Sequence, residues 1–527
     1  MVILLFSALG CIPAEYGERT PEERDPMDAW SLEEGTIQGC DEPVDGVSYV
    51  ESGLLLGIDT EWFDPAAPGG HEDGPSLAIG DPNEDGFLDL IVARMANGQS
   101  HIYRGQPGSF VDFAGVLGPG RSPLMADVDR DGSLDVLLAG PNPMWARLDE
   151  DLNPQTQVMP AMEDGESASV VHDWTMADFD GMPGMEVLAV RTASPFGQGE
   201  VSNDRMFSLT EDGPVLTADW VPEEVGLRHG FDAVSFDEDQ DGDPDVYMVH
   251  DHGATVGPST LLLNQNGSFE DAASDCFCSI SASAKGVDIA DLDGDGLPEL
   301  FVTGAPLNTL LSRTSDGWVD RSDASGVRDE VSLAAGWGGV FFDLGNDGQQ
   351  DLLLAQGDRW NPGQTDLPDG SPALFDEPLH ALAFRGGGFV DAAGEVGLDA
   401  EGSFRAVLAT DLNEDGVEDL IVTQVADRTL VFLSEGCTSA NWIRVDAPVG
   451  AKVEVVTSET VHTGWSRVGR GFQSTARVPL HFGLGADSEV DEIRVHWGGM
   501  EFASTGPFLA RQTITVRGPA PLVSGKE

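Results

Sequence analysis

Lysine and arginine are scarce in this sequence. Its 527 residues include 27 basic and 92 acidic side chains, so the formal net charge is −65 at pH 7. A nucleic-acid-binding protein needs a basic surface to contact phosphates, and docking to an anionic membrane needs basic residues as well. We therefore expect neither kind of partner. The excess of carboxylates predicts good solubility and a requirement for counter-cations.

Long apolar runs and amphipathic helical stretches are also missing. No apolar run is long enough to span a bilayer in the mature chain. The first residues, MVILLFSALGC, form an apolar run that ends in small residues and Cys11, which resembles the end of a bacterial lipoprotein signal. We predict a signal or lipoprotein segment over residues 1–11 and export to the cell surface, the outer membrane or the medium. Membrane attachment is expected only through a lipid on Cys11.

Cysteine is rare, with five residues. If Cys11 carries a lipid, Cys40, Cys276, Cys278 and Cys437 remain, and an even number suits an oxidising compartment. Cys276 and Cys278 are separated by one residue, which predicts that a bond between them would be too tight. A bridge between Cys40 and Cys437 would close the repeat region described below into a ring. Four cysteines allow three pairings, and the sequence does not choose among them.

Familiar catalytic signatures are missing too. The sequence contains no GxSxG elbow, HExxH helix, Walker A loop or GxGxxG after a strand. The cluster of His250, Asp251 and His252 reads as an exposed loop, and Trp337 and Trp360 fit either a carbohydrate site or a propeller core. We predict that the protein is not an enzyme. The alternative is a carbohydrate-active hydrolase or lyase built on the same scaffold.

Acidic repeats are what the sequence has in abundance. One nine-residue pattern has Asp at position 1, Asp or Asn at 3, Asp at 5, Gly at 6 and Asp or Glu at 9. Full copies begin at Asp81, Asp127, Asp237, Asp291 and Asp411. A weaker copy at Asp343 has Gly345 at position 3, and another at Asp178 has Met182 and Pro183 at positions 5 and 6. Spacings of roughly 50 residues indicate one supersecondary unit per repeat.

The residues on either side of the pattern predict β-hairpins. Short apolar runs such as AVSF (233–236) precede it, and runs such as PELFVTG (298–304) follow it. Each unit therefore reads as strand, acidic loop, strand. We predict an all-β fold, a seven-bladed β-propeller with calcium-binding hairpin loops, over residues 46–440. A linear β-solenoid is the alternative, although solenoid repeats are usually shorter.

The loops have the composition of calcium sites. Calcium takes six to eight oxygen ligands, which side chains at positions 1, 3, 5 and 9 and the carbonyl at position 7 can supply, while Gly at position 6 permits the turn. Because the last carboxylate is at position 9 and a strand follows at once, these are not EF-hands. We predict about five or six Ca²⁺ ions. The Asp178 loop departs from the pattern, and the sequence does not decide whether it binds metal. The predicted ligands are Asp81, Asn83, Asp85, Phe87 and Asp89; Asp127, Asp129, Asp131, Ser133 and Asp135; Asp237, Asp239, Asp241, Asp243 and Asp245; Asp291, Asp293, Asp295, Leu297 and Glu299; Asp343, Asp347, Gln349 and Asp351; and Asp411, Asn413, Asp415, Val417 and Asp419.

These repeats resemble FG-GAP/VCBS repeats, the calcium-loop propeller blades that also occur in integrin α subunits. The resemblance covers roughly residues 46–440 and is specific in six of the seven units. It implies an extracellular binding or adhesion module whose ligand is an unidentified protein or polysaccharide. A scaffold for an outer-membrane complex is a further alternative.

The C-terminal part differs from the repeats. Residues 441–527 hold nine basic and nine acidic side chains, so they are net neutral, and segments such as KVEVVT (452–457) read as strands. We predict a small β domain over residues 441–520. The strings GAKV (450–453), GFQS (471–474) and HFGLG (481–485) resemble the ASPIC/UnbV domain. Residues 12–45, rich in Pro and Glu, are predicted to be an acidic, disordered linker.

Overall fold

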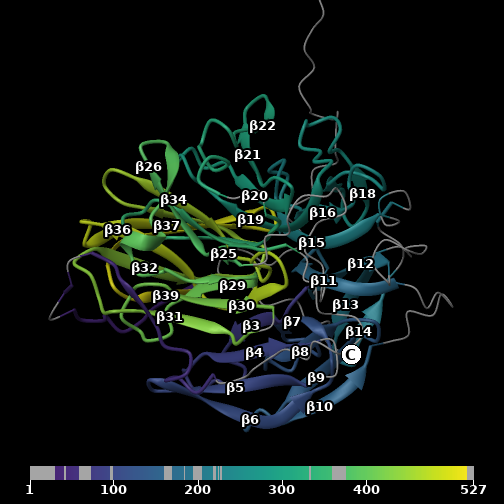
Figure 1. Ribbon diagram of the computed structural model, residues 1–527, viewed down its shortest axis with the longest axis horizontal. Helices are drawn as coiled ribbons and strands as arrows, with labels where there is room; N and C mark the ends of the chain where they lie inside the picture. Colours follow the sequence, from purple (N-terminus) through teal and green to yellow (C-terminus); the bar gives the residue numbers. More distant parts are fainter. Residues whose placement is uncertain are drawn as a thin grey trace, which may run out of the picture.

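The computed structural model describes residues 30–40, 43–44, 46–58, 73–94, 99–159, 169–182, 184–193, 204–217, 221–222, 225, 228–331, 334–358, 376–425 and 427–518. These residues form mostly β-strands (Figure 1). In this part of the chain no helix has the length and apolar character needed to cross a membrane. The predicted segment 1–11 with Cys11, residues 12–29 of the predicted linker and Trp360 lie outside the described residues.

Seven sheets follow one another along the described chain, each built on an antiparallel meander. A strand from the C-terminal part adds a fifth strand to the first sheet, and a strand from the N-terminal part supplies the fourth strand of the last. The first four sheets are β3 (Ser76–Gly80), β4 (Asp89–Ala93), β5 (Ser100–Gln106) and β6 (Ser109–Leu117); β7 (Arg121–Ala126), β8 (Asp135–Ala139), β9 (Met144–Leu148) and β10 (Pro154–Val158); β11 (Ser169–Ala177), β12 (Glu186–Ala193), β13 (Arg205–Thr210) and β14 (Gly213–Leu216); and β15 (His229–Phe236), β16 (Asp245–Asp251), β17 (Thr260–Asn264) and β18 (Phe269–Asp271). The other three are β19 (Ser283–Ala290), β20 (Glu299–Ala305), β21 (Thr309–Thr314) and β22 (Gly317–Asp320); β23 (Gly336–Phe342), β24 (Asp351–Gln356), β26 (His380–Arg385) and β27 (Gly388–Asp391); and β29 (Phe404–Thr410), β30 (Asp419–Gln424), β31 (Leu430–Ser434) and β2 (Tyr49–Glu51). A short 3-10 helix, η2 (Ala393–Glu395), lies between the last two sheets in the chain. The strand β25 (Glu377–Pro378), which precedes β26, pairs with β28 (Glu401–Gly402), which precedes β29.

The sheets are arranged in a ring. The first strand of each sheet contacts the first strand of the next, from β3 through β7, β11, β15, β19 and β23 to β29, and β29 in turn contacts β3. The early strand β2 pairs with β31 and completes the last sheet. Radial arrangement of this kind protects strand edges from the solvent. The predicted all-β, propeller-like fold is therefore confirmed.

The hydrophobic core lies between neighbouring sheets. Leu77 and Tyr103 of the first sheet pack with Leu408 and Ile421 of the last, and corresponding clusters lie between the other neighbouring pairs. Every residue of β4 and β8 is buried. Because other sheets cover both of their faces, these strands are continuous apolar runs such as DLIVA rather than alternating ones.

The C-terminal part folds as two sheets packed on each other. One contains β1 (Ser31–Glu34), β39 (Thr513–Arg517), β32 (Asn441–Asp446) and β36 (Leu480–Gly485), and the other contains β34 (Val461–Trp465), β33 (Lys452–Val456), β37 (Glu489–Trp497) and β38 (Met500–Leu509). Ile443, Val453, Ile493 and Val516 are fully buried between them. Alternating burial along β33 matches the alternating sequence KVEVV.

Part of the predicted linker is ordered in this domain. Residues 31–34 form β1, which pairs with β39, and the ring of Trp30 stacks on Phe502 with centroids 5.3 Å apart. The linker prediction over residues 12–45 was therefore wrong for this stretch. The composition of residues 12–45 is polar, but Trp30 and Leu32 find an apolar surface that only the distant C-terminal strands provide.

A segment of the C-terminal part also enters the ring of sheets. The strand β35 (Ser474–Ala476) pairs in parallel with β3, and Ser76 Oγ donates to Gln473 Oε1 (2.9 Å). The Phe472 ring lies 5.1 Å from Trp337 and 6.4 Å from Phe231, which belong to two other first strands. Residues 471–476, which we name the central segment, therefore fill the middle of the ring.

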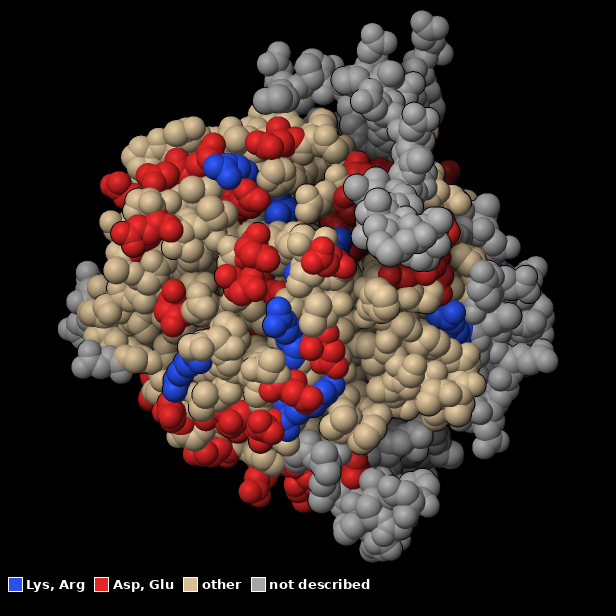
Figure 2. Space-filling model, turned by 90° about the horizontal axis from the view of Figure 1, so that it is seen from above, with Lys and Arg blue, Asp and Glu red and all other residues tan. Residues whose placement is uncertain are grey.

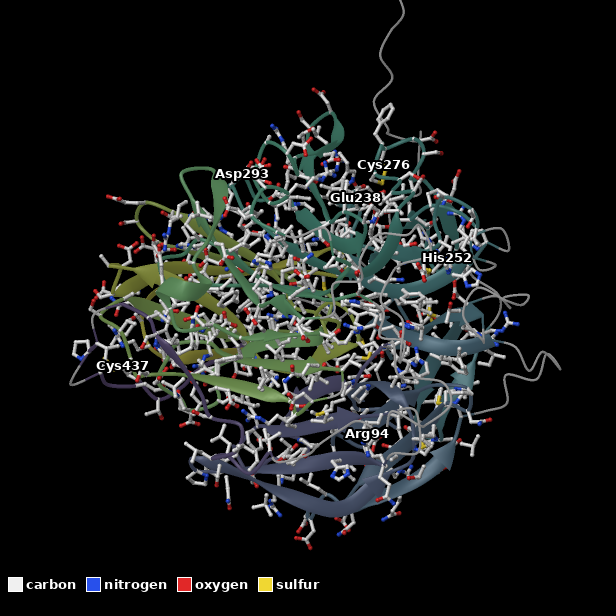
Figure 3. All side chains as sticks on the ribbon, in the orientation of Figure 1. Arg94, Glu238, His252, Cys276, Asp293 and Cys437 are labelled. Atoms are coloured by element: carbon white, nitrogen blue, oxygen red, sulfur yellow. A yellow bond between two sulfur atoms is a disulfide. The ribbon has the colours of Figure 1, made fainter. Side chains whose placement is uncertain are left out.

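Two disulfides link the four described cysteines. Cys40 is bonded to Cys437, so the pairing that would close the repeat region is the one present. Cys276 is bonded to Cys278, which contradicts the expectation that their spacing is too tight. The residue between them, Phe277, adopts a positive φ of 62°, which turns the chain so that the two cysteines meet. Cys276 and Cys437 lie in different parts of the molecule in Figure 3.

Candidate metal-binding loops

Each acidic loop is folded by hydrogen bonds from its own backbone to its own carboxylates. Between β15 and β16, Gly242 N–H donates to Asp237 Oδ2 (3.0 Å), and Asp243 N–H donates to Asp241 Oδ1 (2.9 Å). The same two bonds, from position 6 to position 1 and from position 7 to position 5, recur in the loops that begin at Asp81, Asp127, Asp291, Asp343 and Asp411. They orient the carboxylates toward the inside of the turn.

The glycine at position 6 has a backbone conformation that other residues rarely adopt. Its φ is positive in all six loops, from 79° at Gly296 to 99° at Gly132. A Cβ atom would be strained there, which explains why the pattern specifies Gly at this position.

The structure brings predicted ligands together in three of the loops. Ligand atoms within 4.8 Å of one another come from Asp127, Asp129 and Asp131; from Asp237, Asp239 and Asp245; and from Asp291, Asp293 and Asp295. In the loops at Asp81, Asp343 and Asp411, position 3 is Asn83, Gly345 or Asn413, so these loops have fewer carboxylates to converge. The position 7 residues donate their N–H groups to the position 5 carboxylates, and calcium ligation by their carbonyl groups stays a prediction.

Several loop carboxylates have an oxygen that is buried and has no hydrogen-bond partner among the described residues. These atoms include Oδ1 of Asp127, Asp129 and Asp237 and Oδ2 of Asp89. A buried carboxylate oxygen without a partner is costly, because it has lost its water without replacement. A hard cation that takes oxygen ligands at 2.3–2.6 Å would satisfy these atoms. The donor set therefore fits calcium.

Burial and mutual repulsion make these carboxylates hard to ionise without a cation. Burial and the neighbouring charges of Asp241 and Asp239 together raise the pKa of Asp237 to about 7. Burial and Asp241 raise the pKa of Asp239 to about 6 in the same way. A divalent ion between them would reverse this effect, so ion binding and proton release should be linked.

The carboxylate at position 9 also closes the hairpin. Asp245 accepts hydrogen bonds from the backbone N–H groups of Glu238 and Asn264, both at 2.7 Å. Equivalent backbone bonds are made to Asp89, Asp135, Glu299, Asp351 and Asp419. Burial raises the pKa of Asp89, Asp135 and Asp351 to about 7. Position 9 thus has a structural role in addition to the ligand role that the sequence predicts.

Arginine side chains contact ligand carboxylates in three loops, which sequence reasoning missed. Arg104 Nη2 lies 3.0 Å from Asp85 Oδ2, Arg147 Nε pairs with Asp129, and Arg444 pairs with Asp411. Arg104 and Arg147 stand on the third strand of the same sheet as their loop, where no short-range pattern connects them to it. Each guanidinium supplies part of the charge compensation that an ion would supply.

The loop at Asp178 is better formed than its sequence predicts. Ligand atoms of Asp178, Asp180 and Glu186 lie within 4.8 Å of one another, and Phe179 N–H donates to Glu186 Oε2 (3.0 Å). The signal for this cluster was the retention of acids at positions 1, 3 and 9. Positions 5 and 6 hold Met182 and Pro183 in place of Asp and Gly, which is why the sequence does not decide whether this loop binds an ion.

Comparison with known protein families gives two matches. The ASPIC and UnbV model matches residues 446–521, and the FG-GAP-like repeat model matches residues 81–138 and 237–302. The chain carries FG-GAP-like repeats and a C-terminal ASPIC/UnbV domain. Each of the two FG-GAP matches includes two of the acidic loops. Neither domain is typical of catalytic families.

Individual relatives are distant. Cartilage acidic protein 1 of Homo sapiens is 22% identical over 498 residues, which cover 76% of this chain and 74% of that protein. Among solved structures, BBS1N in complex with ARL6DN is 12% identical, with 70% of this chain and 95% of that chain covered and a TM-score of 0.40. The V. cholerae biofilm matrix protein Bap1 is 15% identical, with 84% and 61% covered and a TM-score of 0.29.

The ASPIC/UnbV domain sits directly on four of the acidic loops. Lys452 Nζ donates to the carbonyl of Gly296 (2.9 Å), and the side chains of His481 and Asn346 are 2.6 Å apart. Arg444 reaches Asp411, and a Cβ atom on Gly242 would lie 2.5 Å from Gly499 of the domain. The loops at Asp237, Asp291, Asp343 and Asp411 are therefore partly covered by the domain.

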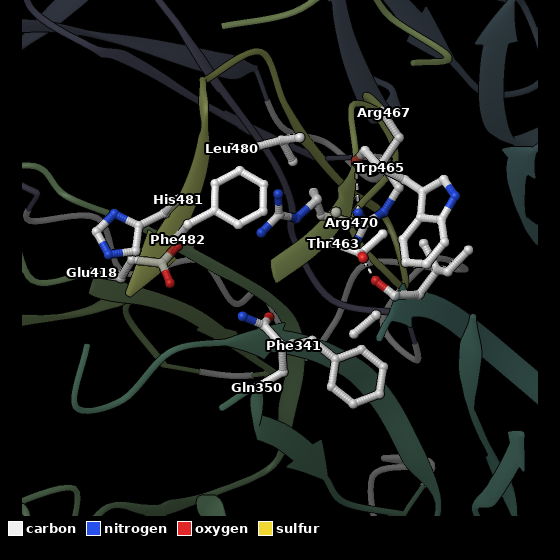
Figure 4. A pocket seen from close by; sticks show the side chains of 13 residues that line it. Phe341, Gln350, Glu418, Thr463, Trp465, Arg467, Arg470, Leu480, His481 and Phe482 are labelled. Carbon is white, nitrogen blue, oxygen red and sulfur yellow. Dashed lines mark hydrogen bonds between the residues drawn. The ribbon is translucent and has the colours of Figure 1, made fainter. Parts of the chain in front are cut away.

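A small polar cavity of about 40 Å³ lies in this contact (Figure 4). Phe341, Gln350 and Glu418, which belong to the ring of sheets and its loops, line one side of it. Arg470 and His481 of the ASPIC/UnbV domain line the other. Burial raises the pKa of Glu418, and burial lowers the pKa of His481. Charged and titratable side chains are thus buried between the two parts, which fixes their relative position.

The other sequence candidates have structural roles. His250 is fully buried and its Nδ1 lies 2.9 Å from the carbonyl of Pro258, so the interpretation as an exposed loop was wrong for this residue. Asp251 pairs with Lys285 at 2.8 Å, while His252, labelled in Figure 3, is partly exposed. Trp337 is buried beside the central segment, so it belongs to the core.

Proposed function

We propose that this protein is an exported calcium-binding module whose FG-GAP-like repeats and ASPIC/UnbV domain together bind an extracellular partner. The observation that carries the calcium proposal is the set of buried oxygens without a partner in Asp127, Asp129 and Asp237. Extracellular sites of this kind typically bind calcium with Kd values of about 10⁻⁴–10⁻³ M. The two disulfides support an oxidising compartment.

Calcium stoichiometry and thermal unfolding of the full chain test this proposal. We expect about five or six ions per chain in millimolar calcium, with a melting temperature well above that in EDTA, since ions that bind the folded state stabilise it. No bound calcium and equal melting temperatures in both conditions would overturn it.

Replacement of one ligand tests the assignment of the loops. Asp295→Ala removes the position 5 carboxylate from the Asp291 loop, where it lies with Asp291 and Asp293 within 4.8 Å. We expect one ion fewer per chain and unchanged binding at the other loops. Asp316→Ala, in an exposed turn outside the loops, serves as the control. Unchanged stoichiometry in Asp295→Ala would contradict the assignment.

A further inference from the structure

A cavity of about 270 Å³ opens beside the loop at Asp343. One wall comes from the loop itself and from Phe384 and Arg385 at the end of β26. The opposite wall comes from residues 46–47 and 438–440, which the Cys40–Cys437 disulfide and the bridge between Val44 and Thr438 hold together. Its volume suits one small organic group, such as a single sugar ring, rather than a peptide segment.

Gly345 keeps this cavity open. It occupies position 3 of the loop, where the five full copies have Asp or Asn. A Cβ atom at Gly345 would meet no other atom within 4 Å, and its φ is outside the range that disfavours other residues. The absence of a side chain is therefore not required by the backbone or by packing. Asp347 and Asp351 also line this cavity, and of the two carboxylates Asp347 is the exposed one.

Thr438 lines this cavity, and its hydroxyl group is unsatisfied. The residue is only 6% exposed, and its Oγ1 has no hydrogen-bond partner among the described residues. A buried hydroxyl normally has a hydrogen-bond partner, so the missing partner of Thr438 points to a polar group of a ligand that enters the cavity. Asp347 supplies an exposed acceptor nearby. Arg385 is half-exposed and pairs with Glu395 at 3.3 Å, and its guanidinium has further N–H groups that can donate to a ligand.

These groups match the chemistry of a carbohydrate. Sugar hydroxyls donate to carboxylates and accept from guanidinium and hydroxyl groups, and the half-buried Phe384 offers an apolar surface for the ring. Acidic side chains are spread over the face of the molecule in Figure 2, and the net charge of −65 disfavours anionic ligands. We propose that this cavity binds one neutral sugar residue of a polysaccharide. The proposal names the ligand class for the binding role proposed above.

Saturation-transfer NMR on the full chain tests this site, with mannose, galactose and N-acetylglucosamine as probes. Because Asp347 and Asp351 are also predicted calcium ligands, spectra are recorded in millimolar calcium and in EDTA. We expect transfer to at least one sugar. Saturation transfer to a sugar in calcium but not in EDTA shows that the ion takes part in binding. Saturation transfer in EDTA shows that the sugar contacts the side chains directly. No transfer to any of the three sugars in either condition would overturn the proposal.

Two substitutions locate the binding. Gly345→Leu fills the cavity without backbone strain and should abolish saturation transfer to the sugar. Gly39→Leu should not, because Gly39 is an exposed glycine with equally open space around its Cβ and lies outside the cavity and the acidic loops. Thr438→Val should weaken sugar affinity about tenfold, the usual effect of one lost hydrogen bond. Thr429→Val is its matched control, since Thr429 Oγ1 is also buried and unpartnered among the described residues but lies outside the cavity.

The results separate this proposal from the calcium proposal. Sugar binding in EDTA that Gly345→Leu abolishes supports the cavity even if the chain binds no calcium. Calcium binding with sugar transfer that survives both Gly345→Leu and Thr438→Val would overturn the cavity and leave the calcium loops in place.

Discussion

At the scale of single residues, arginine and calcium make competing contributions to the same carboxylates. Arg147→Gln removes the guanidinium that pairs with the buried Asp129. We expect a lower melting temperature in EDTA and a roughly fivefold tighter calcium site, since one charge in a partly hydrated site is worth about 1 kcal/mol. Calorimetric titration measures the affinity. Arg328→Gln, whose partners Asp320 and Asp323 lie outside the loops, should leave it unchanged.

A second prediction at this scale concerns pH. Burial raises the pKa of Asp204 to about 8, although Arg191 N–H donates to it (2.6 Å). The folded state therefore keeps a proton on Asp204 that the unfolded state loses above a pKa near 4, so its contribution to stability falls as pH rises from about 4 to 8. Asp204→Asn should have little effect near pH 4 and should stabilise the protein progressively toward pH 8. Denaturant unfolding at several pH values measures this, and a difference that is constant with pH would contradict it.

At the scale of the loop and its two strands, position 6 differs between repeats in what it touches. Gly296→Ala should cost about 1 kcal/mol, because the residue has a positive φ and the nearest atom to a Cβ, Lys452 Nζ, is 3.7 Å away. Gly242→Ala should cost more, since its Cβ would also lie 2.5 Å from the backbone of Gly499. Equal losses in chemical denaturation would show that the contact with the C-terminal domain is not rigid.

At the scale of the whole molecule, the central segment makes the two parts interdependent. Phe472 is fully buried against Trp337 and Phe231, so Phe472→Ala should cost about 3–5 kcal/mol. We expect a single calorimetric transition in the parent protein that shifts to lower temperature in this variant. Two separate transitions in the parent would contradict the shared core. Phe277→Ala, at an exposed position outside this contact, should leave the melting temperature nearly unchanged.

The sequence predicts the features whose residues are close together in the chain. The five full loops and the strands beside them were visible because positions 1 to 9 and the flanking apolar runs form one local unit. The contacts between Arg147 and Asp129 and between Phe472 and Trp337 were not visible, because they depend on how strands and sheets are placed in space. Small residues such as Gly286, whose Cβ would lie 2.7 Å from Phe472 N, carry no local signal of that approach.

The order in which strands pair has a consequence for how the protein is made. β1 needs β39, β2 needs β31, and β3 is flanked by β35, so the earliest strands wait for partners that are synthesised hundreds of residues later. The ring of sheets is not complete until Ala476 has been added, and the sheet that contains β1 is not complete until Arg517 has been added. A nascent chain therefore exposes unpaired strand edges through most of its synthesis. If the chain is exported as proposed, this delay keeps it unfolded until it has been translocated.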